Sequence, residues 1–146
     1  MKPLSNDIFF AQVEQEIASG NSVRFKVKGN SMFPLLRNEK DEVSLSPLAA
    51  TPQKMDIVLF RFNGKHILHR IIDVTDGVYI IQGDGIYTFS EHCRKEDIVG
   101  VVTSLHKAGC KAVSTASGWY KFYSAVWLKL RFCRRYLLAI LRRLYR

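Results

Sequence analysis

The sequence is poor in cysteine and has no long uninterrupted apolar segment. Its three cysteines, Cys93, Cys110 and Cys133, are odd in number and follow no metal-ligand spacing. They do not indicate a disulfide framework, and they favour a reducing compartment. No run of about 18 or more uncharged apolar residues occurs, and Met1 to Gly20 lacks the apolar centre of a signal peptide. We therefore expect neither a membrane-spanning helix nor a secretory leader.

Acidic residues are absent from the last third of the chain. Residues 1–97 carry 12 Lys and Arg against all 13 Asp and Glu, a net charge of −1, whereas residues 98–146 carry the other 10 basic residues and no acid, a net charge of +10. The total of +9 therefore belongs to the C-terminal third, and a nucleic-acid binder that is basic over its whole surface is not predicted. With 146 residues and 47% apolar content, the chain is long enough for one compact domain plus an appendage.

Alternating apolar and polar residues predict a mainly β core of short antiparallel strands, preceded by a short helix. Asn6 or Asp7 is placed to cap that helix, which we expect to run to about Ala18. Asn63-Gly64 and Asp76-Gly77 are typical two-residue hairpin turns. The predicted strands cover residues 23–28, 43–45, 55–62, 65–74, 78–82 and 98–105, with a variable stretch before the last one.

The domain organisation predicted from these patterns has four parts. An N-terminal helical segment, residues 1–22, precedes the β core, residues 23–106. A linker, residues 107–116, leads to residues 117–146, which are predicted to form one long amphipathic helix with eight basic residues and no acid.

The C-terminal helix has the composition of a helix that lies in a membrane interface, because its polar face carries one sign of charge and its apolar face is rich in aromatic residues. Packing on the core or on a partner chain is the alternative. An arm for nucleic acid is a third hypothesis, which the ordered apolar face disfavours. The residues expected to contact an anionic membrane are Trp119, Trp127, Lys129, Arg131, Arg134, Arg135, Arg142 and Arg143, of which only Arg134 falls on the apolar side.

A serine follows the first predicted strand, in the stretch Gly29-Asn30-Ser31-Met32-Phe33-Pro34. Glycine and proline force the chain out of the strand, so Ser31 is exposed and held in position, as a nucleophile must be. An ordinary loop serine has the same local pattern. A serine hydroxyl is a weak nucleophile without a base, so the interpretation depends on residues further along the chain.

Four segments in order resemble the catalytic region of type I signal peptidases and of the related LexA-like self-cleaving repressors. They are residues 29–34 (GNSMFP), 55–60 (MDIVLF), 67–72 (ILHRII) and 82–85 (QGDG). The families share a G-x-S-M-x-P box, a strand beginning with Gly-Asp, a box with a basic residue and a GD box. The resemblance covers roughly residues 23–103 and implies a small LexA/signal-peptidase-like catalytic β domain.

The resemblance assigns roles to particular residues. Ser31 matches the nucleophile, and His69 matches the general base, as in the endoplasmic-reticulum type of signal peptidase. A neutral imidazole can take the hydroxyl proton at physiological pH. Glu91 is the expected orienting carboxylate, with Asp84 as the alternative partner or as a residue that fixes the turn. The oxyanion hole is expected to use the Ser31 N–H and the Asn30 side chain.

The resemblance also departs from the family pattern at three points. The GD box reads Gly83-Asp84-Gly85, Glu91 replaces the usual aspartate, and Met55 replaces the glycine of the strand box. These departures leave the third catalytic residue open and keep the Ser–His pair. His92 is a further candidate for that third position. Arg70 is expected to be structural or to hold a nearby carboxylate.

We expect a serine endopeptidase that cleaves exported or maturing peptides at a membrane surface, with no metal or other cofactor. Its expected partners are a peptide or preprotein substrate and an anionic membrane, rather than nucleic acid. The basic helix would replace the N-terminal anchor of signal peptidases and hold the protein peripherally, on the cytoplasmic face.

Two other hypotheses remain to be compared with the peptidase. A catalytically inactive relative would use the same cleft to bind a peptide at a membrane surface. A self-cleaving repressor would need a DNA-binding domain, and the 22 residues before the first strand are too few for a helix-turn-helix.

Overall fold

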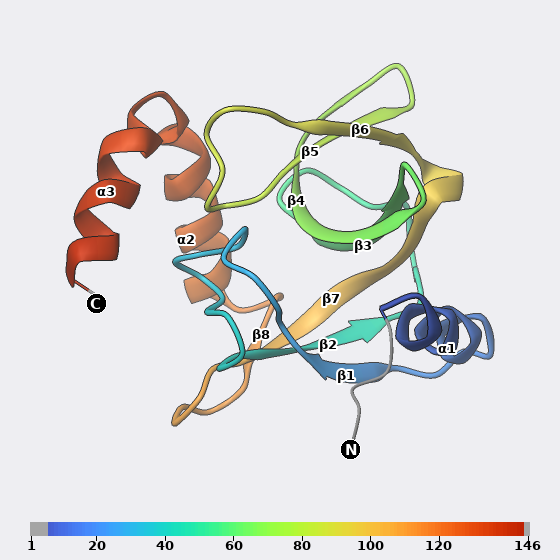
Figure 1. Ribbon diagram of the computed structural model, residues 1–146. Helices are drawn as coiled ribbons and strands as arrows, with labels where there is room; N and C mark the ends of the chain where they lie inside the picture. Colours follow the sequence, from blue (N-terminus) through green and yellow to red (C-terminus); the bar gives the residue numbers. More distant parts are fainter. Residues whose placement is uncertain (1–5, 145–146) are drawn as a thin grey trace.

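The computed structural model describes residues 6–144 of the chain (Figure 1). The predicted end of the C-terminal helix, residues 145–146, and the start of the N-terminal segment, residues 1–5, lie outside the described residues. The elements, in chain order, are α1 (Asn6–Ala18), β1 (Val23–Lys26), β2 (Glu42–Ser46), β3 (Ile57–Phe62), β4 (Lys65–Thr75), β5 (Val78–Gln82), β6 (Glu91–Arg94), the 3-10 helix η1 (Lys95–Asp97), β7 (Ile98–His106), β8 (Val113–Ser114), α2 (Gly118–Lys129), the 3-10 helix η2 (Arg131–Cys133) and α3 (Arg134–Leu144).

The strands form one antiparallel sheet, which confirms the prediction of a mainly β protein. The strand order is β1-β2-β7-β3-β4-β5-β6, with β8 paired to β7. The register shifts where β7 pairs with β2 and with β3, and again between β4 and β5. Such irregularities increase the bend and twist of a sheet. In Figure 1 the half of the sheet from β3 to β6 is accordingly curled above β1 and β2, with β7 crossing between them.

The two tight hairpins have the turns that the sequence predicts. In the β3–β4 turn Asn63 and Gly64 have φ of 51° and 77°, and in the β4–β5 turn Asp76 and Gly77 have φ of 50° and 76°. Positive φ at both central residues is the type I′ geometry, whose twist matches that of antiparallel strands. The β4 ladder, which carries His69, is therefore fixed in register at both ends by local sequence.

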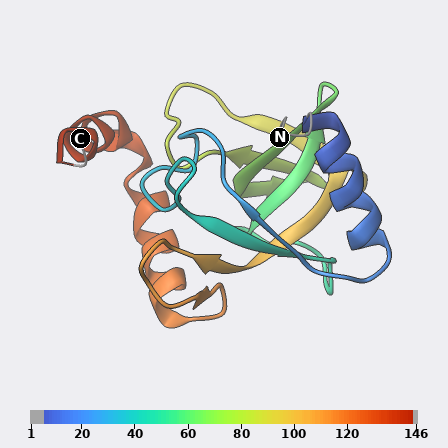
Figure 2. The ribbon, with the colours of Figure 1, turned by 60° about the horizontal axis from the view of Figure 1, so that its bottom comes forward.

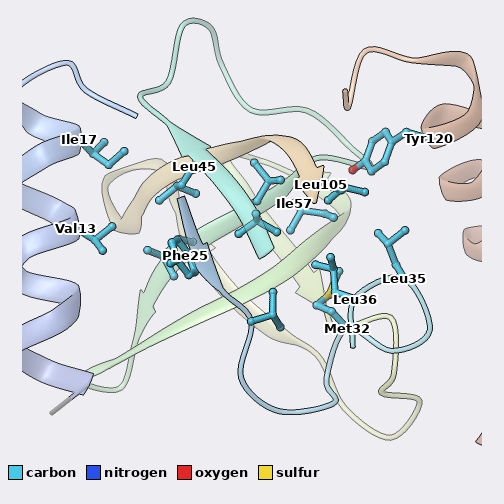
Figure 3. Close-up of a cluster of buried hydrophobic side chains, with 14 residues drawn as sticks. Val13, Ile17, Phe25, Met32, Leu35, Leu36, Leu45, Ile57, Leu105 and Tyr120 are labelled. Carbon is cyan, nitrogen blue, oxygen red and sulfur yellow. The ribbon is translucent and has the colours of Figure 1, made fainter. Parts of the chain in front are cut away.

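The main hydrophobic cluster lies between α1 and the sheet and extends to α2. Val13 and Ile17 of α1 are buried against it from one side, and Tyr120 of α2 from the other (Figure 3). Figure 2 shows α1 and the pair α2–α3 on opposite sides of the curled sheet. Each such aliphatic side chain contributes about 1.5–3 kcal/mol when fully buried. The second cluster lies inside the β3–β6 half and includes Phe60 and Ile81.

The prediction of one long C-terminal helix is wrong. The chain leaves the α-helix at Leu130 and makes the 3-10 turn η2 before α3 begins. Residues 119–144 contain no glycine or proline, so no local breaker marks this point. The break gives α2 and α3 different directions, and each helix then buries its own stripe of side chains.

Two strands also lie where none was predicted. β6 lies in the stretch treated as variable, and β8 lies in the segment treated as a linker. The remaining predicted strands agree with the observed ones to within two residues at either end.

None of the helices in residues 6–144 combines the length and the apolar content needed to cross a membrane.

Candidate active site

Ser31 lies in the loop that follows β1. The Val27 N–H donates a hydrogen bond to the Asp41 carbonyl at 2.9 Å, which closes this loop at its base. Gly29 has φ of 86°, a left-handed conformation that favours glycine and turns the chain towards Ser31. Ser31 itself is half-buried. The loop is anchored by four buried side chains after the serine, those of Met32, Phe33, Leu35 and Leu36.

The turn after β5 packs directly against the serine loop. The Gly85 N–H donates a hydrogen bond to the Ser31 carbonyl at 2.8 Å. A Cβ atom on Gly83 would lie 2.3 Å from that same carbonyl oxygen and 3.0 Å from Nε2 of His69. A Cβ atom on Gly85 would lie 2.5 Å from the Asn30 carbonyl oxygen. Only glycine fits such approaches, so the two glycines allow the serine loop and the imidazole to lie on either side of one turn.

Glu91 contacts the imidazole of His69 from the side of β6. Nδ1 of His69 lies 2.7 Å from Oε1 of Glu91, and both side chains are buried. The ring N–H is too poorly aligned for a good hydrogen bond, and among the described residues Oε2 of Glu91 has no hydrogen-bond partner. A carboxylate at this distance orients a histidine ring and stabilises its protonated form. The two ring nitrogens thus have different surroundings, Glu91 beside Nδ1 and the Gly83 turn beside Nε2.

Asp84 does not contact His69, because it is bound to Arg70. Arg70 donates from Nε to Oδ1 at 2.8 Å and from Nη2 to Oδ2 at 2.9 Å, and both side chains are buried. Arg70 also donates to the carbonyl of Met55 and to the hydroxyls of Tyr120 and Ser124. Burial alone would lower the pKa of Arg70, but the Asp84 carboxylate raises this pKa above its ordinary value. The prediction that Arg70 holds a carboxylate is confirmed.

The C-terminal helices hold the turn that supports the site, and two predicted membrane contacts are therefore corrected. Trp127 is 6% exposed and donates from Nε1 to the Asp84 carbonyl at 3.0 Å. Arg134 is 2% exposed and donates to the Gln82 side chain at 3.0 Å and to the Ile86 carbonyl at 3.3 Å. Burial lowers the pKa of Arg134, and the nearby Asp84 offsets part of this effect. Neither side chain is available to a membrane.

Most of the other residues predicted to contact a membrane lie on the outer face of the two helices. Phe33, Leu138 and Trp127 form a small cluster that covers the inner face. The exposed face carries Trp119, Lys129, Arg131, Arg135 and Arg143. Arg142 is exposed too, but it donates from Nη2 to the Gly85 carbonyl at 3.4 Å and so points towards the turn that contacts the serine loop. The exposed face also carries large apolar and aromatic side chains, those of Phe122, Val126, Phe132, Tyr136, Ile140 and Leu144.

The remaining candidate residues have weaker positions. The Asn30 side chain is exposed and makes no hydrogen bond within residues 6–144, so its expected oxyanion role stays a prediction. His92 is exposed on β6 and points away from the buried His69. Burial raises the pKa of Cys93 to about 11, which leaves little thiolate at neutral pH. In the described part of the chain, no group of three or more His, Cys, Asp and Glu side chains is arranged to hold a metal ion.

A groove of about 830 Å³ connects these residues to α1. Ser31, His69 and Glu91 line it, together with Phe10 and His66. His66 marks the end of the groove near α1, and His69 marks the end near Ser31. The two histidines are three residues apart on β4, so these two ends are roughly 10 Å apart. The edge strands β1 and β6 both contribute to its walls, which makes the groove the gap between the two ends of the curled sheet.

Sequence patterns missed the residues that α1 and α2 contribute. Phe10 and Tyr120 belong to helices that are distant from the serine in sequence, and a helical period does not reveal what each side chain meets.

The chain matches no protein-family model and no curated protein.

Proposed function

We propose that this chain is a serine endopeptidase of the signal-peptidase type, with Ser31 as nucleophile and His69 as general base. The observation that carries the proposal is one groove lined by Ser31, His69 and Glu91, in which Nδ1 of the imidazole lies 2.7 Å from the carboxylate. The other ring nitrogen, Nε2, lies next to Gly83, in the turn that packs against the Ser31 carbonyl. The proposal assigns to these three residues the roles of nucleophile, base and orienting acid.

The chemistry follows from these roles. Oγ of Ser31 attacks the carbonyl carbon of the peptide bond while Nε2 of His69 takes the hydroxyl proton. The tetrahedral intermediate collapses, the C–N bond breaks, and the imidazolium gives that proton to the leaving amine. Water then attacks the ester, again losing a proton to His69, and releases a carboxylate and free Ser31. Glu91 stabilises the imidazolium in both halves of the reaction.

The groove suits an extended peptide. Within residues 6–144, β1 pairs only with β2, so its other edge is free to pair with an added strand. Arg24 to Lys28 line the groove along this strand. A substrate strand can add to such an edge through main-chain hydrogen bonds. The serine lies a few residues beyond the end of β1, where a peptide bound along this edge would be presented to it.

We also propose that the outer face of α2 and α3 binds an anionic membrane surface. The exposed surface of the two helices carries apolar residues such as Phe122 and Ile140 as well as the bases Arg135 and Arg143, and residues 98–146 contain no acid. Apolar burial combined with positive charge is the pair of signals that interfacial helices use. Substrates would then be exported or maturing peptides presented at that surface.

The test of the peptidase is covalent labelling of Ser31. A fluorophosphonate probe should modify the wild-type protein, and mass spectrometry of a digest should locate the adduct on Ser31. The S31A variant should not be labelled, whereas S19A, which removes an exposed serine hydroxyl from the end of α1, should be labelled like the wild type. Hydrolysis of a peptide mixture should follow the same order. Labelling or hydrolysis that survives in S31A would exclude the proposal.

A second candidate is a catalytically inactive relative that binds peptides in the same groove. Two observations favour it. The hydroxyl of Ser31 makes no hydrogen bond within residues 6–144, and Nδ1 of His69 lies close to Oε1 of Glu91 without forming a well-aligned hydrogen bond to it. Peptide binding without labelling of Ser31 would identify this activity. Catalytic hydrogen bonds often tighten only when substrate is bound, so the peptidase is preferred.

A further inference from the structure

The end of the groove next to α1 is built from aromatic rings. Phe9, Phe10 and Phe25 meet edge to face, with centroid distances of 5.1, 5.7 and 6.2 Å and interplanar angles of 68° to 89°. The imidazole of His66 stacks on Phe10 at 4.9 Å. All four side chains line the groove, and those of Phe9 and Phe10 are only partly buried. Three mutually tilted rings leave edges and faces for a further large apolar or aromatic group.

Positive charge borders the same part of the groove. Arg24 and Lys26 lie on one face of β1, and Lys28 follows two residues after the strand; the three alternate with less exposed residues and are all exposed. Arg24 is paired with Glu42 at 3.1 Å. Lys26 and Lys28 have no acidic partner within residues 6–144, although both line the groove.

The acids nearby are already engaged. Glu91 lies against His69 at the catalytic end, and Glu14 of α1 lies 2.6 Å from His66 and 3.5 Å from Arg61. The unpaired charge that faces a bound peptide is therefore that of the two lysines. The occupant that complements this surface carries acidic residues and a bulky apolar side chain.

We propose that the groove selects acidic peptides with a large apolar or aromatic side chain, which binds against Phe9, Phe10 and Phe25, while Lys26 and Lys28 bind the acidic residues. This specificity rests on the proposed function, because it assigns the substrate class of the same groove. The aromatic end is roughly 10 Å from the catalytic end, about three residues of an extended peptide. The selective residue therefore lies about three positions from the cleaved bond.

The experiment measures peptide binding to the full chain carrying S31A, so that binding is separated from hydrolysis. Fluorescein-labelled octapeptides are compared by fluorescence polarisation: one with a central Phe and two Glu, one with Ala in place of Phe, and one with Lys in place of both Glu. The first should bind best. Loss of the aromatic group should weaken binding at least about tenfold, and the charge change should weaken it most at low salt.

Variants of the protein should change the same two preferences separately. F10A should reduce the Phe-over-Ala preference, and F10L, which keeps an apolar side chain in the core, covers the case in which F10A does not fold. K26E/K28E should remove the preference for acidic peptides. The matched controls are Q12A on the exposed face of α1 and K65E/K111E, a charge change at exposed residues outside the groove.

Equal binding of the three peptides, tighter binding of the Ala or Lys peptide, or no binding of any of them would overturn the inference. A failure of the peptidase proposal has a different outcome: the peptide preferences would persist in S31A, while the wild-type protein would neither hydrolyse peptides nor react at Ser31.

Discussion

At the scale of single residues, a buried carboxylate closes the loop that carries Ser31. Asp41 is fully buried and accepts hydrogen bonds from the Arg37 guanidinium at 3.0 and 3.1 Å and from the Ala108 N–H at 3.0 Å. Lys107 lies 3.4 Å away. Burial alone would raise the pKa of Asp41, but these hydrogen bonds and charges together hold this pKa well below its ordinary value. The ionised form is therefore the one that the fold requires.

The sign of this shift predicts a pH dependence of stability. Because the pKa is lower in the folded state, the ionised carboxylate stabilises the fold above the unfolded pKa, and this contribution is lost as pH falls below about 4. We expect D41N to lower the free energy of unfolding at pH 7 by on the order of 2 kcal/mol or more. Urea unfolding of the wild type and D41N at pH 7, 5 and 3 measures this difference in the free energy of unfolding.

The control for Asp41 is the exposed Glu96, where E96Q should change stability by less than about 0.5 kcal/mol. The wild type should lose more stability than D41N between pH 5 and pH 3, because the variant has no carboxylate to protonate. Equal losses in the two proteins would show that Asp41 contributes nothing to the acid sensitivity.

At the scale of elements, α2 and α3 have two different faces. The inner face supplies Tyr120, Ser124, Trp127 and Arg134 to the polar network around Arg70 and to the turn that follows β5. The outer face has only basic and apolar side chains at its most exposed positions on α3. The two faces have different surroundings, so variants on each can be tested independently.

The outer face predicts binding to anionic vesicles. The protein should co-sediment with vesicles of phosphatidylglycerol and phosphatidylcholine more than with phosphatidylcholine alone, and binding should decrease with salt. R135E/R143E should weaken binding at least about tenfold, since each basic residue contributes on the order of 1 kcal/mol. The control R94E/K95E changes the charge equally at exposed positions on β6 and η1.

The vesicle experiment has two outcomes that would contradict a membrane surface. One is equal binding of the two double variants. The other is weak vesicle binding combined with salt-sensitive RNA binding that R135E/R143E abolishes, which would identify the face as a nucleic-acid surface.

At the scale of the whole molecule, the basic C-terminal third is part of the fold. The sheet alone would leave the Arg70–Asp84 pair without the hydroxyls of Tyr120 and Ser124 and without the cover of Trp127. Without the helices, the apolar surface that Tyr120 and Trp127 cover would also be exposed to water, which destabilises the fold. The helices and the groove lined by Ser31 and His69 therefore depend on one another through the turn Gly83–Ile86.

Removal of residues 117–146 should abolish cooperative unfolding, because the loss of Trp127 alone is expected to cost about 3–5 kcal/mol of the 5–15 kcal/mol typical of a domain. Thermal unfolding followed by circular dichroism measures this. W119A, which removes a half-exposed indole from the outer face of α2, should stay close to the wild type. A truncated chain with an unchanged transition would mean that the helices are an appendage.

The sequence predicted those parts of the fold and site that depend on local pattern. The hairpin dipeptides at residues 63–64 and 76–77 require positive φ, so they located two turns and the register of β4. The order of the four segments pointed to Ser31 and His69. Their catalytic roles remain predictions, but the structure brings both to one groove.

The choice between Glu91 and Asp84 could not be made from the sequence. Asp84 and Glu91 follow Gly83 by one and eight positions, and their partners, Arg70 and His69, are adjacent on β4. Adjacent residues of a strand point to opposite faces, so the assignment depends on how the following turn and β6 cross that strand. Only the tertiary structure contains this information.

The sequence by itself determined the strand pattern, the glycine positions and the concentration of positive charge in the last third, because each depends on residue type and spacing alone. The tertiary structure decided which charges are solvated. Residue type and spacing do not distinguish Arg134 and Trp127 from the exposed basic and aromatic residues of the same helices. In the fold these two side chains are buried, where they donate hydrogen bonds to Gln82 and to the Asp84 carbonyl. A periodic pattern identifies residues that share a face, but only packing determines what covers that face.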